Sequence, residues 1–195
     1  MGVINMTGNN VSRYVRDMVI TALMAAIVFV ATYSIKINSF GGYVHLGDSM
    51  VLLSALLLGR KKGAIASAIG MGLADLLYMP IWAPFTIVIK AVMAIIAASI
   101  ALRKDYEGEK VWNNALAFIV AGLWMTAAYF VAGALVAGLI LGEQPTLAAA
   151  FAVSLKDVPG NLWQASAGIF IALPVGSMLM KAGLVELVNR RGYNS

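Results

Sequence analysis

The positive charge of this chain lies in four short clusters that separate six apolar segments. Of its 14 Lys and Arg residues, 11 belong to these clusters. If both termini and the two basic loops face the cytoplasm, all 11 obey the positive-inside rule. The pattern therefore predicts six transmembrane helices with both chain ends in the cytoplasm. The clustered residues are Arg13, Arg16, Arg60, Lys61, Lys62, Arg103, Lys104, Lys110, Lys181, Arg190 and Arg191.

The composition supports a membrane protein rather than a soluble one. Hydrophobic residues make up 61% of the chain and charged residues 12%, which is far from the composition of soluble domains. Six segments of about 20 residues would use most of the 195 residues, so we expect one all-α integral membrane domain over residues 1–195. The net charge of +5 lies beside segment ends, as expected for contact with anionic lipid. We therefore expect a bilayer as partner and no nucleic acid.

The apolar runs predict helices at about residues 16–33, 46–58, 63–78, 85–102, 112–141 and 159–181. The 34–45 and 142–155 stretches are expected on the outer side. The segment 78–84 carries two prolines, which end the helical pattern there. The basic loops at 59–62 and 103–110 are expected inside.

Small residues four positions apart allow transmembrane helices to approach closely. In the third and fifth predicted helices such stripes indicate packing inside the protein. In the first helix, Ala22 and Ala26 lie in the cytoplasmic half. Spacing alone leaves two possibilities for these two alanines, internal packing or the docking of a partner.

Three cations, Lys36, Lys90 and Lys156, are not explained by topology because they lie on or near the outer side. Charges at membrane depth usually face a cavity or form pairs, and Asp75 lies at a depth similar to that of Lys90. We therefore predict a ligand cup on the outer side, in which Asp75 and Lys90 either contact the ligand or pair with each other. Trp82, Lys156 and Asp157 are equally well explained as an interfacial aromatic and helix caps. The candidate ligand-binding residues are Tyr43, His45, Asp48, Asp75, Tyr78, Lys90, Tyr129, Asn161, Trp163 and Gln164.

The sequence carries no pattern typical of an enzyme. It has no Gly-rich phosphate loop ending in Lys-Ser/Thr, no H-E-x-x-H zinc motif, and no G-x-S-x-G with a suitable His. It has no cysteine, and His45 is its single histidine. We therefore expect no catalytic residues, no metal and no cofactor.

Several motifs resemble one known family. The runs Val44-His-Leu-Gly-Asp48, Leu52-Leu-Ser-Ala-Leu-Leu-Leu-Gly-Arg-Lys-Lys-Gly63 and Gly72-Leu-Ala-Asp75 are similar to the substrate-binding (S) components of energy-coupling factor (ECF) transporters. The run Pro159-Gly-Asn-Leu-Trp-Gln164 and the Ala22-x-x-x-Ala26 motif also resemble this family. The resemblance covers nearly the whole chain.

The resemblance implies a six-helix vitamin-binding protein of the prokaryotic plasma membrane, without enzymatic activity. Its implied partners are a transmembrane coupling protein and two ATPase subunits, with Ala22 and Ala26 on the docking face. The outer loop from Ser34 to His45 would close over the ligand. The motifs look closest to members for vitamin B6 or hydroxymethylpyrimidine, with riboflavin and pantothenate members next. A stand-alone secondary transporter and a structural membrane subunit remain as alternatives from other classes.

Overall fold

A computed structural model describes residues 8–34, 36–39, 42–103 and 106–183, with side chains described from residue 11 and not for 36–39 and 42–44. The elements are α1 (Gly8–Ser34), β1 (Lys36–Ser39), β2 (Gly42–His45), α2 (Gly47–Tyr78), a 3-10 turn (Pro80–Trp82), α3 (Ala83–Ala101), α4 (Val111–Leu135), a π-helical turn (Val136–Ile140), α5 (Leu147–Ser154), a second 3-10 turn (Leu155–Asp157) and α6 (Val158–Lys181). The strands β1 and β2 form an antiparallel hairpin in which Lys36 pairs with His45. Over the described residues the fold is thus helical except for this hairpin, which the expectation of an all-α chain did not include.

α2 is two helical arms joined at Gly59. Gly59 has φ 75° and ψ −172°, a left-handed backbone that glycine adopts without a steric penalty. The arms, 47–58 and 60–78, fold back on each other. The Ser54 and Ser67 hydroxyls, one from each arm, therefore lie only 2.9 Å apart. These arms match the second and third predicted helices. The basic residues predicted as a loop at 60–62 already belong to the second arm.

Glycine and alanine allow the helices to pack closely. A methyl group placed on Gly70 of the second arm would lie 2.5 Å from the carbonyl oxygen of Ala25 in α1. Ala66 and Ala74 on this arm are buried as well. This confirms that the small residues of the predicted third helix serve internal packing.

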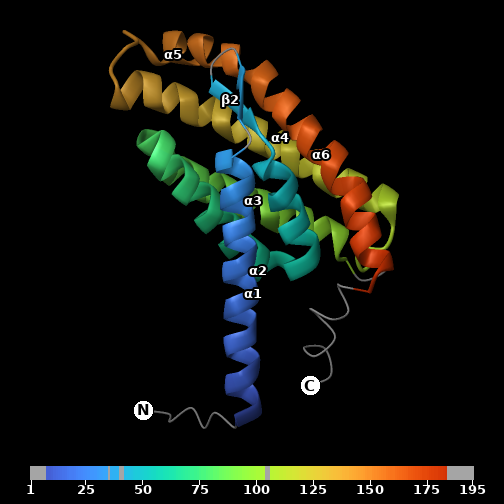
Figure 1. Cartoon of the computed structure of the whole chain (residues 1–195). Helices are drawn as coiled ribbons and strands as arrows, with labels where there is room; N and C mark the ends of the chain where they lie inside the picture. The colour runs from blue at the N-terminus through green and yellow to red at the C-terminus, as the bar shows by residue number, and fades with distance from the viewer. Residues whose placement is uncertain (1–7, 35, 40–41, 104–105, 184–195) are drawn as a thin grey trace.

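The hairpin and α5 lie at the upper end of the molecule, whereas the first residues of α1 and the last residues of α6 lie toward the lower end (Figure 1). α5 falls in the stretch predicted only as an outer loop. Its first turn is capped by Thr146, whose hydroxyl accepts a hydrogen bond from the Ala149 amide at 3.2 Å. α6 begins beside Pro159, which suits a first helical turn.

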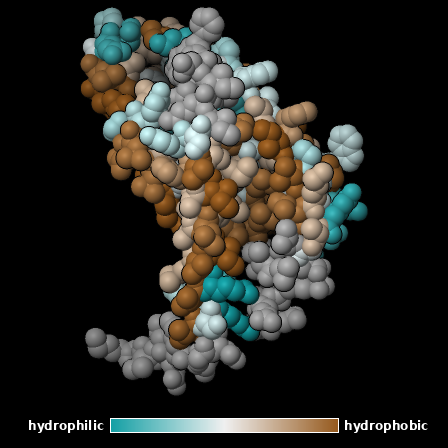
Figure 2. Space-filling model, viewed as in Figure 1, coloured by the Kyte–Doolittle hydropathy of each residue, from teal (hydrophilic) through white to brown (hydrophobic). Residues whose placement is uncertain are grey.

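Within the part of the chain that the structure describes, four segments are long and apolar enough to cross a membrane, namely 11–34, 80–101, 111–140 and 147–181. Figure 2 shows hydrophobic side chains over the middle of the visible face, with hydrophilic ones at the upper end and near the lower part of α1. This distribution is that of a protein whose middle zone contacts lipid.

Candidate functional site

A buried ion pair joins α2 to α3. Asp48 lies in the first turn of α2, and its carboxylate contacts the Lys90 ammonium of α3. Both side chains have an exposed fraction of 0%. Gln164 of α6 donates a hydrogen bond from Nε2 to the second carboxylate oxygen of Asp48 at 2.8 Å. The carboxylate therefore holds three helices together through charge and hydrogen bonding.

α4 completes the surroundings of the Lys90 ammonium. Its Nζ lies 3.0 Å from the sulfur of Met125 and 5.2 Å from the centre of the Tyr129 ring. A cation facing an aromatic ring is attracted by the ring's quadrupole, more strongly when water is absent. Lys90 is thus held by groups from two other helices, α2 and α4, and snorkelling to the membrane surface does not occur.

The predicted Asp75–Lys90 pair is wrong, because Lys90 pairs with Asp48. Asp75 instead accepts a hydrogen bond from the Thr86 hydroxyl. The helical positions explain why Asp75 meets Thr86. Asp75 precedes the last residue of α2 by three positions, and Thr86 follows the first residue of α3 by three, so these two side chains lie at equal depth. Lys90 lies one turn further into α3, about 6 Å along the axis, where it reaches Asp48.

Thr86 also links Asp75 to Tyr129. The Thr86 and Tyr129 hydroxyl oxygens lie 2.9 Å apart. Since the Tyr129 ring faces Lys90, a continuous chain of polar contacts runs through α2, α3, α4 and α6. We call it the polar chain; its members are Asp75, Thr86, Tyr129, Lys90, Asp48 and Gln164.

Aromatic side chains pack against one end of the polar chain. The ring centres of Trp82 and Tyr129 are 6.0 Å apart and tilted by 56°, and those of Trp82 and Phe85 are 6.4 Å apart, edge to face. All three side chains are half-buried. Such rings offer flat faces for stacking an aromatic ligand.

Four other predicted ligand residues whose side chains the structure describes are not members of the polar chain. His45, at the end of β2, is buried, and its Nδ1 accepts a hydrogen bond from the Gly47 amide at 3.2 Å. Tyr78 and Trp163 are exposed, Trp163 by 68%, and Asn161 is half-buried on α6. The Tyr43 side chain falls outside the described residues. Among the described side chains, the polar chain therefore contains five of the ten predicted ligand residues: Asp48, Asp75, Lys90, Tyr129 and Gln164.

Two members of this neighbourhood, Thr86 and Met125, were missed by sequence reasoning. Each precedes a predicted residue by four positions, Thr86 before Lys90 and Met125 before Tyr129. Residues four apart share a helix face, so this spacing could have identified both. Among the described residues, no three His, Asp or Glu side chains lie close enough to hold a metal ion.

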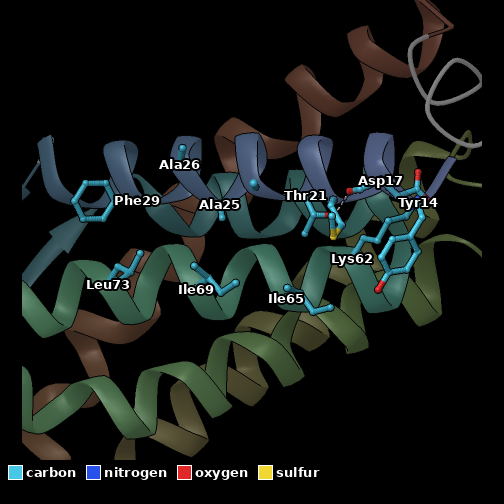
Figure 3. A pocket seen from close by; sticks show the side chains of 12 residues that line it. Tyr14, Asp17, Thr21, Ala25, Ala26, Phe29, Lys62, Ile65, Ile69 and Leu73 are labelled. Carbon is cyan, nitrogen blue, oxygen red and sulfur yellow. Dashed lines mark hydrogen bonds and ion pairs between the residues drawn. The ribbon is translucent and has the colours of Figure 1, made fainter. Parts of the chain in front are cut away.

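A second feature is a groove of about 620 Å³ between α1 and the second arm of α2. Figure 3 shows Phe29 and Leu73 at one end and Tyr14, Asp17 and Lys62 at the other. Asp17 and Lys62 form an ion pair at 3.3 Å across the polar end. The groove is lined by Tyr14, Asp17, Met18, Thr21, Ala22, Ala25, Ala26, Phe29, Lys62, Ile65, Ile69 and Leu73.

The two predicted docking residues, Ala22 and Ala26, lie in this groove and are exposed. Their neighbour Ala25, by contrast, is buried against α2. The first helix therefore uses one set of small residues for internal packing and leaves another set uncovered within this chain.

Comparison with known proteins identifies the family of the chain. Residues 12–181 match the family model described as the ECF-type riboflavin transporter S component. A protein of Pyrococcus woesei, described as an uncharacterized protein in a gap 3' region, is 34% identical over 100 residues, which are 51% of this chain and 68% of that protein. The chain thus belongs to the family of ECF-type riboflavin transporter S components, which are membrane-embedded, vitamin-binding subunits of transporters and not enzymes.

Proposed function

We propose that this protein is the high-affinity binding subunit of an ATP-driven ECF vitamin importer in a prokaryotic plasma membrane. In this proposal the chain spans the membrane six times, with the two arms of α2 as two spans. Both termini and the basic residues at 60–62 and 103–110 face the cytoplasm. The hairpin and α5 then lie outside, at the end opposite to the start of α1 (Figure 1).

The observation that carries the proposal is the polar chain with its aromatic neighbours. Asp48 follows the end of β2 by three residues, and Asp75 lies three residues before the outer end of α2. The polar chain therefore begins just below the hairpin. Aromatic faces beside a carboxylate and hydroxyl groups suit a small heteroaromatic ring that carries hydroxyl groups.

Two substrates are candidates. The motifs of the sequence resemble S components for vitamin B6 or hydroxymethylpyrimidine, whose single rings would fit against Tyr129 and Trp82. The family model that matches the chain names riboflavin, which makes riboflavin the second candidate. Riboflavin has a larger, three-ring system and would need a longer stacking surface.

The groove between α1 and α2 is the proposed docking surface for the transmembrane coupling protein, which in turn would bind two ATPase subunits. Ala22 and Ala26 give the groove a floor without long side chains. A helix of the coupling protein can approach such a floor closely, which favours association within lipid.

Calorimetric titration of the purified full-length protein with pyridoxine, hydroxymethylpyrimidine and riboflavin tests the proposal. We expect one of them to bind with a defined one-to-one stoichiometry. Asp75→Asn should weaken that binding tenfold or more, whereas Glu109→Gln, at an exposed residue near the opposite end of the molecule, should not. Absence of binding by all three compounds would contradict the proposed function.

A further inference from the structure

Thr86 joins two members of the polar chain, Asp75 and Tyr129, although its own side chain carries neither a charge nor a ring. Its side chain is 1% exposed. Its hydroxyl donates to a carboxylate oxygen of Asp75 and lies 2.9 Å from the hydroxyl of Tyr129. A threonine hydroxyl has one hydrogen, and a carboxylate only accepts. With that hydrogen directed at Asp75, Tyr129 must be the donor in the second bond.

This arrangement fixes the direction of the Tyr129 phenol. The ring also contacts groups whose position relative to it depends on its orientation, among them the Lys90 ammonium at 5.2 Å from the ring centre and the Trp82 ring at 6.0 Å. A tyrosine side chain rotates about two bonds, so a hydrogen bond at its far end restrains the whole ring.

We propose that Thr86 is a positioning residue that fixes the Tyr129 ring, and with it the Tyr129 and Trp82 faces that the vitamin contacts. Asp75 orients the Thr86 hydroxyl, Thr86 accepts the Tyr129 hydrogen, and the ring is thereby held against Trp82. This inference rests on the proposed function for its ligand. Its structural part, the restraint on Tyr129 and Trp82, concerns the protein alone.

A buried threonine can also act in a purely local way, and α4 provides the comparison. Thr126 is 6% exposed, and its hydroxyl donates to the Gly122 carbonyl one turn earlier in the same helix at 3.0 Å. This bond joins no second element. Thr126→Val is therefore a matched control for Thr86→Val, since both changes remove a buried hydroxyl and keep the β-branched shape.

The first test needs no ligand. Trp82 is labelled with 5-fluorotryptophan in full-length protein whose other tryptophans, Trp112, Trp124 and Trp163, are replaced by Phe. Thr86→Val and Tyr129→Phe should each shift or broaden the fluorine resonance, and their combination should do no more than either alone. Thr86→Ser, which keeps the hydroxyl, and Thr126→Val should leave it unchanged.

The second test measures affinity for whichever of pyridoxine, hydroxymethylpyrimidine and riboflavin binds the wild type. Thr86→Val should weaken binding about two- to tenfold, as expected for one lost hydrogen bond, and Thr86→Ser should restore it. An unchanged fluorine resonance in Thr86→Val, or equal effects of Thr86→Val and Thr126→Val on resonance and affinity, would overturn the positioning role. If the wild type binds none of the three compounds, the proposed function fails while the fluorine spectrum still decides the role of Thr86.

Discussion

Replacing Lys90 with methionine removes one partner of the fully buried ion pair. The Asp48 carboxylate would keep its hydrogen bond from Gln164 at 2.8 Å, but the oxygen that faces Lys90 would lose the ammonium. Both side chains have an exposed fraction of 0%, so water cannot replace the lost partner. Breaking a buried pair in this way costs about 3–5 kcal/mol of stability. For a chain of this size that corresponds to a fall in Tm of about 6–20 °C.

The assay is thermal unfolding of the purified protein in detergent, followed by the loss of helical circular dichroism. The double variant Asp48→Asn, Lys90→Met removes both charges and keeps an acceptor for Gln164, so it should recover at least half of the lost Tm. Lys61→Met, at an exposed lysine, is the control and should leave Tm unchanged. If Lys90→Met is as stable as the wild type, or if the double variant is less stable than Lys90→Met, the ion pair does not hold the helices together as we reason.

Three further predictions follow from the fold. Because the chain has no cysteine, single cysteines introduced at Pro145 and Lys62 can report topology. We expect an impermeant maleimide applied to intact cells to label position 145 and not position 62. The reverse pattern would refute the six-span orientation. Ala22→Arg should abolish uptake that depends on the ATPase partners while vitamin affinity stays within twofold, since the long side chain fills the groove; equal loss of both would assign Ala22 to internal packing. Gly70→Val should lower Tm by several degrees, because its side chain would meet the α1 backbone, and an unchanged Tm would contradict the close approach of α1 and α2.

Periodicity and charge predicted most helices within a few residues but not how the chain turns between them. The turn between the arms of α2 needs Gly59 alone, because its left-handed backbone reverses the chain in one residue. The hairpin was not predicted, because strands of four residues are too short to give an alternating pattern. α5 was missed although Thr146 followed by an alanine-rich run is a recognisable helix start.

The candidate site, too, was predicted in part: single residues were identified from the sequence, but their contacts were not. Lys90 was identified because topology did not explain its charge, and it lies at the centre of the polar chain. Its partner could not be deduced, since Asp48 and Asp75 were both available and the choice depends on how each helix is rotated about its axis. Helical periodicity defines a face on each helix but not which faces of neighbouring helices meet. Thr86 shows the limit most clearly, because its importance comes from contacts to two other helices.

Mass spectrometry of the small molecules released from the purified protein tests the central claim most directly. If the chain is a vitamin-binding S component, protein purified from cells grown with vitamins should release one heteroaromatic vitamin in an amount close to one per chain. Thr86→Val and Asp75→Asn, which alter the polar chain, should release less of the same compound. Protein that releases no such molecule, and that stays empty after incubation with pyridoxine, hydroxymethylpyrimidine and riboflavin, would contradict the account.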